Sequence, residues 1–97
     1  MTSRERLLLS IADELERVAT LTEDVGANIA AEIDFTPANL DKLQAIDVAA
    51  QTQRLVATLL RDMMTDAPEH CLDRVGMEAL RRRLAAGLSP VMIEEAA

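Results

Sequence analysis

A short break at residues 34–37 separates two long stretches of helix-forming sequence, and it limits the folds that this chain can adopt. Thr36 is a residue type that caps helices, and Pro37 suits the first helical position, where no hydrogen bond is lost. Because the break is short, the flanking helices must fold back on each other. We therefore predict an all-α fold built on a long antiparallel hairpin, with helices at about residues 3–33 and 37–65.

The first helix begins with a capping signal and carries one apolar seam. Thr2 and Glu5 have the three-residue spacing of a capping box. Beyond them, apolar residues recur at alternating steps of three and four, which predicts one seam against the second helix. The seam comprises Leu8, Ile11, Leu15, Val18, Thr22, Val25 and Ile29. Gly26 lies beside it, and its missing side chain predicts a close approach of the two helices.

The second helix carries two adjacent apolar stripes, one more than a hairpin needs. The first stripe comprises Leu43, Ile46, Ala50, Ala57, Leu60 and Met64, interrupted by Gln53. The second comprises Val48, Thr52, Leu55, Leu59 and Met63. We expect the first stripe to face the first helix, so the second needs another partner. That partner is either a third helix or a second copy of the chain, and we favour a homodimer that forms a four-helix bundle.

A third, shorter helix is predicted at about residues 67–87. Asp66 has the spacing of a cap before it, Gly76 belongs to its apolar face, and Gly87 is placed to end it. Residues 89–90, a Ser-Pro pair, predict one further short turn.

The composition excludes several classes of function. A net charge of −7 is unsuited to a protein that binds the phosphate backbone of nucleic acids. The lone cysteine, Cys71, rules out an intrachain disulfide and a thiolate metal cluster. The start of the sequence lacks the pattern of a signal peptide, and no apolar run approaches the roughly 20 residues of a membrane span. We expect a single cytoplasmic domain of 97 residues with no cofactor of its own and no membrane partner.

The polar face of the second helix carries the residues that point to chemistry. Asp47 and Gln51 are four residues apart, so their side chains are predicted to lie together, one helical turn apart. A carboxamide can hold a water molecule in line for attack, and a carboxylate can pair with a partner's lysine. Positioning of this kind is the main contribution of proteins to phosphoryl transfer. Gln44 and Arg54, on the same face, are candidates for binding the partner.

The run from Leu43 to Gln51, on a long hairpin helix, resembles the active segment of the CheZ chemotaxis phosphatases. Those proteins are helical hairpins that dimerise into a four-helix bundle and dephosphorylate the CheY response regulator through an Asp-x-x-x-Gln motif. The resemblance implies that Gln51 orients the attacking water and that Asp47 pairs with the regulator's lysine. The regulator would supply the Mg²⁺ and the phosphoaspartate. CheZ proteins are longer, and residues 89–97 do not clearly reproduce their CheY-binding end; small CheZ-like proteins called CheT are closer in size.

Three other interpretations stay open. The same face could hold a chemotaxis or signalling protein without catalysis, as a helical adaptor. Asp47 could instead be one more solvated residue, near Arg54 on a charged surface. His70 faintly resembles the start of a histidine phosphotransfer motif, although Asp73-Arg74 stands where that motif has Lys-Gly. A metal site at His70 is disfavoured, because adjacent residues on a helix point in different directions.

Overall fold

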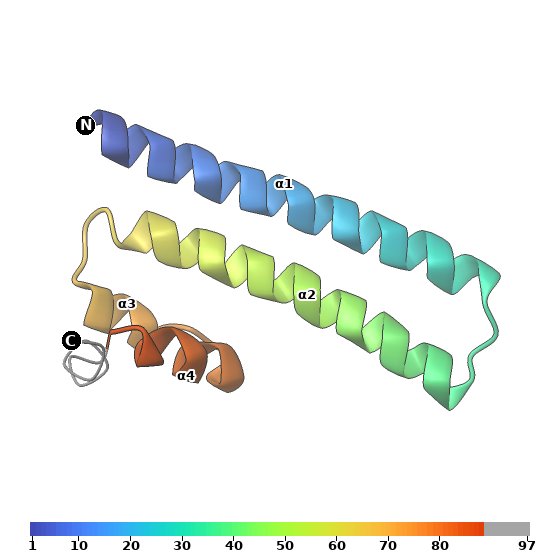
Figure 1. Ribbon diagram of the computed structural model, residues 1–97. Helices are drawn as coiled ribbons and strands as arrows, with labels where there is room; N and C mark the ends of the chain where they lie inside the picture. The colour runs from blue at the N-terminus through green and yellow to red at the C-terminus, as the bar shows by residue number, and fades with distance from the viewer. Residues whose placement is uncertain (89–97) are drawn as a thin grey trace, which may run out of the picture.

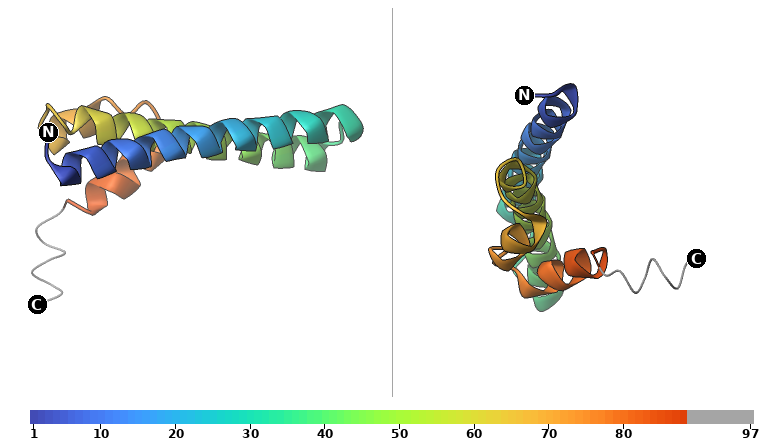
Figure 2. Two further views of the ribbon diagram at one scale, coloured as in Figure 1. Left: turned by 90° about the horizontal axis from the view of Figure 1, so that it is seen from above. Right: turned by 90° about the vertical axis from the view of Figure 1, so that its left-hand side faces the viewer.

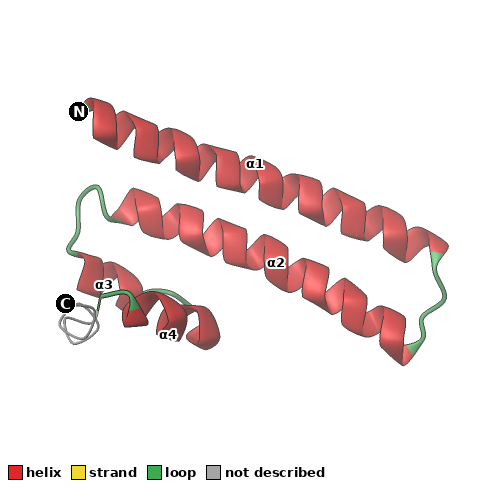
Figure 3. Ribbon diagram, in the orientation of Figure 1, coloured by secondary structure: helices red, strands yellow, loops and turns green. Residues whose placement is uncertain are grey.

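The computed structural model describes residues 1–88, and this range contains four helices and no strand (Figures 1 and 3). The two long helices are α1 (Ser3–Glu32) and α2 (Pro37–Asp62), and the two short ones are α3 (Pro68–Asp73) and α4 (Glu78–Ala86). α1 and α2 pack antiparallel along their length, which confirms the predicted all-α hairpin. None of the helices in the described range has an apolar stretch long enough to span a membrane.

Side-chain caps fix where the two long helices begin. The Thr2 hydroxyl accepts a hydrogen bond from the Glu5 N–H at 3.1 Å, and the Glu5 carboxylate accepts one from the Thr2 N–H at 3.0 Å. This is the predicted capping box, and it satisfies two N–H groups that a helix start leaves without partners. Thr36 caps α2 by accepting from the N–H of Asn39 at 3.2 Å, directly before Pro37.

Small residues lie at the centre of the contact between α1 and α2. The buried residues of the two helices at this contact are Ala12, Ala19 and Gly26 on α1 and Ala50 and Ala57 on α2. On each helix they are spaced seven apart, so they recur on one face after every two turns. Because the distance between packed helices depends on the side chains at the contact, such small residues permit a close approach.

The seam predicted on α1 is therefore rotated away from the true centre of the contact. Ile11, Val25 and Ile29 are 42%, 54% and 37% exposed. Gly26 packs directly against Ile46, which confirms the predicted close approach. The remaining seam residues are half-buried beside the small ones, namely Leu8, Leu15, Val18 and Thr22.

The third helix predicted at residues 67–87 is in fact two short helices, α3 and α4, separated at residues 74–77. The N–H of Val75 bonds to the carbonyl oxygen of Leu72 at 3.0 Å, in a tight turn that closes α3. Gly76, which was predicted on the packing face, lies exposed in this break. The low helix propensity of glycine favours an interruption at this point.

The ends of the short helices also differ from the prediction. Ala67 occupies the N-cap position of α3 and has no side-chain group that could cap it. Asp66, one residue earlier, accepts a hydrogen bond from Arg74 at 2.7 Å instead. Gly87 ends α4 as predicted, although its φ of −69° is right-handed rather than the left-handed conformation usual for a terminal glycine. The turn predicted at residues 89–90 lies outside the described part of the chain.

α3 and α4 lie on the side of α2 that faces away from α1, so α2 is the middle helix (Figure 2). Leu59 of α2 is buried against Cys71 and Leu72 of α3. The half-buried residues packed around this cluster include Met63, Val75 and Leu84. A third helical segment thus covers the end of the second apolar stripe, whereas Val48, nearer the start of α2, stays 46% exposed.

Candidate functional site

The candidate site is an exposed row of polar residues on α2. Gln44, Asp47 and Gln51, here called the polar row, are separated by three and four residues and are all exposed. Residues with this spacing share one face of an α-helix. α2 is uninterrupted around them, because it contains no glycine and its proline occupies the first position. The structure therefore brings the predicted catalytic pair and Gln44 together on one accessible face.

Asp47 and Gln51 are not held by other side chains of residues 1–88. Arg54 was the predicted neighbour of Asp47. The guanidinium of Arg54 instead donates hydrogen bonds to Glu23 and, at 3.1 Å, to the hydroxyl of Thr20. Both of these partners belong to α1. A carboxylate and a carboxamide without internal partners keep their hydrogen-bonding capacity for a second molecule.

Two arginines of α2 bind the acidic flank of α1. Arg54 bonds to Glu23, and this hydrogen bond raises the pKa of Arg54 above its ordinary value. Arg61 bonds to Asp13 at 2.6 Å and to Glu16 at 3.1 Å. The hydrogen bonds to Glu16 and then Asp13 raise the pKa of Arg61 in the same way. These ion pairs join α2 to α1, and because they are largely exposed they contribute little to the stability of the hairpin.

The opposite flank of the hairpin is mostly apolar and carries a neutral polar pair. The hydroxyl of Thr22 lies 2.9 Å from the carbonyl oxygen of Val18, to which it donates, and 3.4 Å from Oε1 of Gln53. Gln53 interrupts the first apolar stripe of α2, and its side-chain amide therefore lies beside the hydroxyl of Thr22 on α1. The hairpin thus has two different flanks: a charged flank with the arginine pairs, and an apolar flank marked by Thr22 and Gln53.

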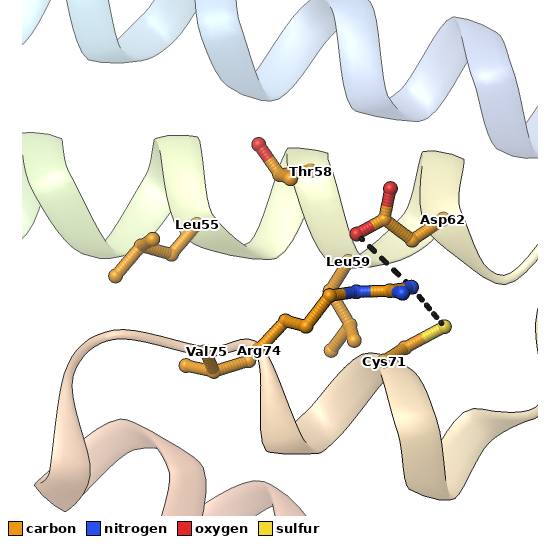
Figure 4. A pocket seen from close by; sticks show the side chains of 7 residues that line it. All are labelled: Leu55, Thr58, Leu59, Asp62, Cys71, Arg74 and Val75. Carbon is orange, nitrogen blue, oxygen red and sulfur yellow. Dashed lines mark hydrogen bonds and ion pairs between the residues drawn. The ribbon is translucent and has the colours of Figure 1, made fainter.

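A small cavity lies at the junction of α2 and α3, and no residue of the polar row lines it (Figure 4). The lining residues are Leu55, Thr58, Leu59, Asp62, Cys71, Arg74 and Val75. Its volume of about 20 Å³ is enough for roughly one water molecule. The Arg74 guanidinium lies 3.7 Å from the Asp62 carboxylate and 3.7 Å from Sγ of Cys71, and a hydrogen bond to Asp66 raises the pKa of Arg74. These contacts hold α3 against α2.

His70 is exposed in the first turn of α3. Cys71, the next residue, is buried, so the two side chains point in different directions. Among residues 1–88, no three His, Cys, Asp or Glu side chains gather where they could hold a metal ion. The phosphotransfer motif places its histidine within a long bundle helix, whereas α3 has six residues.

One protein family, with the description "Domain of unknown function (DUF8776)", has a model that matches residues 2–95 of this chain. The match includes all four helices, so the hairpin and the short helices belong to the same family unit. No curated protein and no solved structure matches the chain.

Proposed function

This chain belongs to the family described as a domain of unknown function (DUF8776), and we propose that it is a CheZ-like signalling protein that acts on a CheY-like response regulator. Its reaction is hydrolysis of the regulator's phosphoaspartate. The observation that carries this proposal is the exposed pair Asp47 and Gln51, side by side on a long antiparallel hairpin without partners among residues 1–88. A long hairpin and an Asp-x-x-x-Gln pair are the features that the chain has in common with CheZ phosphatases.

The proposed reaction needs a water molecule held in line with the bond that breaks. The water oxygen bonds to phosphorus, and the bond between phosphorus and the aspartate oxygen breaks. The regulator's aspartate keeps the electron pair as a free carboxylate, and both water protons stay on the released inorganic phosphate. Gln51 suits the positioning role because its amide oxygen accepts a hydrogen bond from the water while its NH₂ group donates one. Positioning alone supplies a large part of such catalysis.

Asp47 fixes the regulator on the face that carries Gln51, by pairing with the lysine of the regulator's active site. The regulator contributes the Mg²⁺, so the chemistry asks for no metal ligand from this chain. Gln44, one turn before Asp47, extends the contact toward the start of α2. A partner that binds Arg54 would share its guanidinium with Glu23 and Thr20, which accept hydrogen bonds from one of its nitrogens in the free protein.

The test is phosphate release from a CheY-like regulator that has been phosphorylated with a small phosphodonor. The protein should accelerate phosphate release. Gln51→Ala should reduce the accelerated rate by roughly a hundredfold, because the water molecule is no longer positioned. A matched control is the double variant Asp24→Ala, Asn28→Ala, which alters an exposed pair of the same spacing on α1. Equal losses from both changes, or no acceleration by the wild-type protein, would contradict the phosphatase proposal.

The second candidate function is a non-catalytic adaptor that holds a signalling protein. It is favoured by the position of the polar row on an open helix surface rather than in the cavity at α2 and α3. Binding of the regulator that is weakened by Asp47→Ala but causes no phosphate release would establish this alternative. Acid-labile phosphate on His70 would instead support the phosphotransfer interpretation.

A further inference from the structure

The closed end of the hairpin presents the only aromatic residue of the chain to solvent. Phe35 lies in the connection between α1 and α2 and is 68% exposed. Leu40, near the start of α2, is 47% exposed. These two residues, here called the apolar tip, lie at the end of the hairpin opposite the N-terminus and the short helices (Figure 1). Neither α3 nor α4 therefore covers them.

Local packing accounts for only part of the surface of Phe35. Phe35 directly precedes Thr36, the N-cap of α2, and Leu40 is the fourth residue of the helix. This is the spacing of a hydrophobic staple, a contact that fixes how the chain enters a helix. Because 68% of Phe35 stays exposed, the larger part of its side chain has no contact within residues 1–88. Aromatic side chains contribute strongly to the energy of interfaces, so this exposed surface suits a second molecule.

Hydrogen bonds hold the backbone on both sides of Phe35. The N–H of Thr36 donates to the carbonyl oxygen of Asp34 at 2.9 Å, which closes a three-residue turn centred on Phe35. The same carbonyl oxygen accepts from the side-chain amide of Asn39, also at 2.9 Å. The N–H of Asn39 in turn donates to the hydroxyl of Thr36 at 3.2 Å. The turn is therefore ordered before any partner binds, and binding loses little conformational entropy there.

The charges around the apolar tip are mostly negative. Glu32, Asp34 and Asp41 are exposed, and none of them belongs to an ion pair within residues 1–88. Of the ten basic residues of the chain, Lys42 alone lies within residues 29–43. Three carboxylates therefore surround the tip with one ammonium group. Such a rim attracts a positively charged protein surface and is repelled by anionic lipid.

We propose that the apolar tip is a docking point for a second protein, which takes the ring of Phe35 into an apolar pocket bordered by lysine or arginine side chains. A central aromatic anchor surrounded by polar groups is the usual arrangement of a binding hot spot. Gln51 lies about 21 Å along α2 from Pro37, so this contact leaves the catalytic pair free. The proposal does not depend on the phosphatase activity.

The first test replaces Phe35 of the full chain by the photo-reactive residue p-benzoylphenylalanine, in cells that naturally contain the protein. The same replacement of Leu7 is the matched control, because Leu7 is 62% exposed at the other end of the hairpin. Irradiation should link one protein species to position 35 and not to position 7. The absence of a link specific to position 35 would overturn the proposal. A link between two copies of this chain would also overturn it, by assigning the tip to self-association.

The second test measures the affinity of the purified cross-linked partner for the full chain. Phe35→Ser should weaken binding by roughly tenfold or more, as expected for an aromatic anchor. Phe35→Leu should also weaken binding, although it keeps an apolar side chain beside the start of α2, whereas Leu7→Ser should not change the affinity. Circular dichroism should report the same helix content for all three variants. An affinity that Phe35→Ser leaves unchanged would refute the proposal.

Two further measurements identify the chemistry of the partner surface. Added salt should weaken binding of the wild-type chain more than binding of the double variant Asp34→Asn, Asp41→Asn, because the carboxylates attract basic groups. Equal salt dependence would contradict the basic border of the pocket. The wild-type chain should not sediment with vesicles of phosphatidylcholine and phosphatidylserine. Sedimentation that Phe35→Ser abolishes would assign the tip to a lipid surface and overturn the proposal.

Discussion

Gly26 of α1 lies directly against Ile46 of α2: a Cβ atom built on Gly26 would be 2.9 Å from Cγ2 of Ile46. Two carbon atoms without a bond between them do not approach so closely, so any side chain at Gly26 forces a neighbour to move. The atom in the way is a branch of a stiff, β-branched side chain. The contact therefore couples the identity of one residue to the distance between the two long helices.

We predict that Gly26→Ala destabilises the protein despite the better helix propensity of alanine. The propensity gain is about 1 kcal/mol, whereas overpacking a close contact costs about 1–3 kcal/mol. The net loss should be about 1 kcal/mol in urea denaturation. Ile46→Leu removes the Cγ2 branch, so the double variant should recover most of this loss. A Gly26→Ala protein that is more stable than wild type would show that α1 and α2 can move apart to accommodate the added methyl group at little cost.

The capping box predicts how the stability of α1 depends on pH. Hydrogen bonds from the Thr2 backbone and side chain hold the pKa of Glu5 below its ordinary value of 4.5. Because the folded-state pKa is lowered, the contribution of Glu5 is present above pH 4.5 and is lost as the pH falls through the lowered value. Glu5→Gln keeps the capping geometry without the titration. Its melting temperature should therefore fall less than that of wild type between pH 7 and pH 3.

Thr2→Ala should lower the stability at neutral pH by about 1 kcal/mol, as expected for the loss of a side-chain cap. The substitution removes the hydroxyl that accepts from the Glu5 N–H at 3.1 Å. Helix content near the start of α1, measured by amide hydrogen exchange, should decrease while protection in α2 changes little. Uniform loss of protection would mean that the hairpin unfolds as one unit.

Arg61→Ala tests the charged flank. The substitution removes the hydrogen bonds to Asp13 and Glu16, at 2.6 and 3.1 Å, which join α2 to α1. We expect a small drop in melting temperature that becomes smaller in high salt, because exposed charges are screened. Arg83→Ala is the comparison, since Arg83 is an exposed arginine on α4 outside this flank. A loss that does not depend on salt would assign the effect to packing of the arginine stem.

Leu59→Ala tests whether α3 and α4 depend on their contact with α2. Leu59 is buried against Cys71 and Leu72, and its truncation should cost about 2–3 kcal/mol. Because the contact is confined to one end of α2, amide protection should be lost in the short helices before the hairpin. Faster labelling of the Cys71 thiol by iodoacetamide would report the same local opening. Simultaneous loss of amide protection in all four helices would contradict the prediction that the short helices open first.

Asp47→Ala and Gln51→Ala should leave the stability within about 0.5 kcal/mol of wild type, as is usual for exposed residues without special contacts. Neither side chain is held by another side chain among residues 1–88. Urea denaturation of each variant provides the measurement. A clear change in stability would indicate a structural role for the pair and would remove the main support for a binding site.

The long helices could be predicted closely from the sequence because their starts depend on local chemistry. Thr2 and Thr36 cap the helices through neighbours only three residues away, so no tertiary information is needed. The face of α1 that meets α2 was harder to predict from the sequence. Ala12 and Ala19 carry a weak hydrophobic signal, so the larger residues beside them dominated the pattern and rotated the predicted seam.

Partner choice among charged residues could not be predicted, because it depends on the register of the helices. Asp66 was expected to cap α3, but it binds Arg74. Arg54 was expected on the partner-binding face, but it binds Glu23 across the hairpin. The polar row itself follows from helical spacing alone, since residues three and four apart always share a face. The partner that binds the polar row is a second molecule, so its identity depends on a sequence other than this one.

The alanine and glycine residues between the long helices act as a molecular spacer. They set a separation that lets the guanidinium groups of Arg54 and Arg61 reach carboxylates on the neighbouring helix. Enlarging Ala19 or Gly26 would therefore alter the surface charge pattern without changing any charged residue. The interior of this hairpin thus determines which acidic groups on its outer face are neutralised and which stay available to another protein.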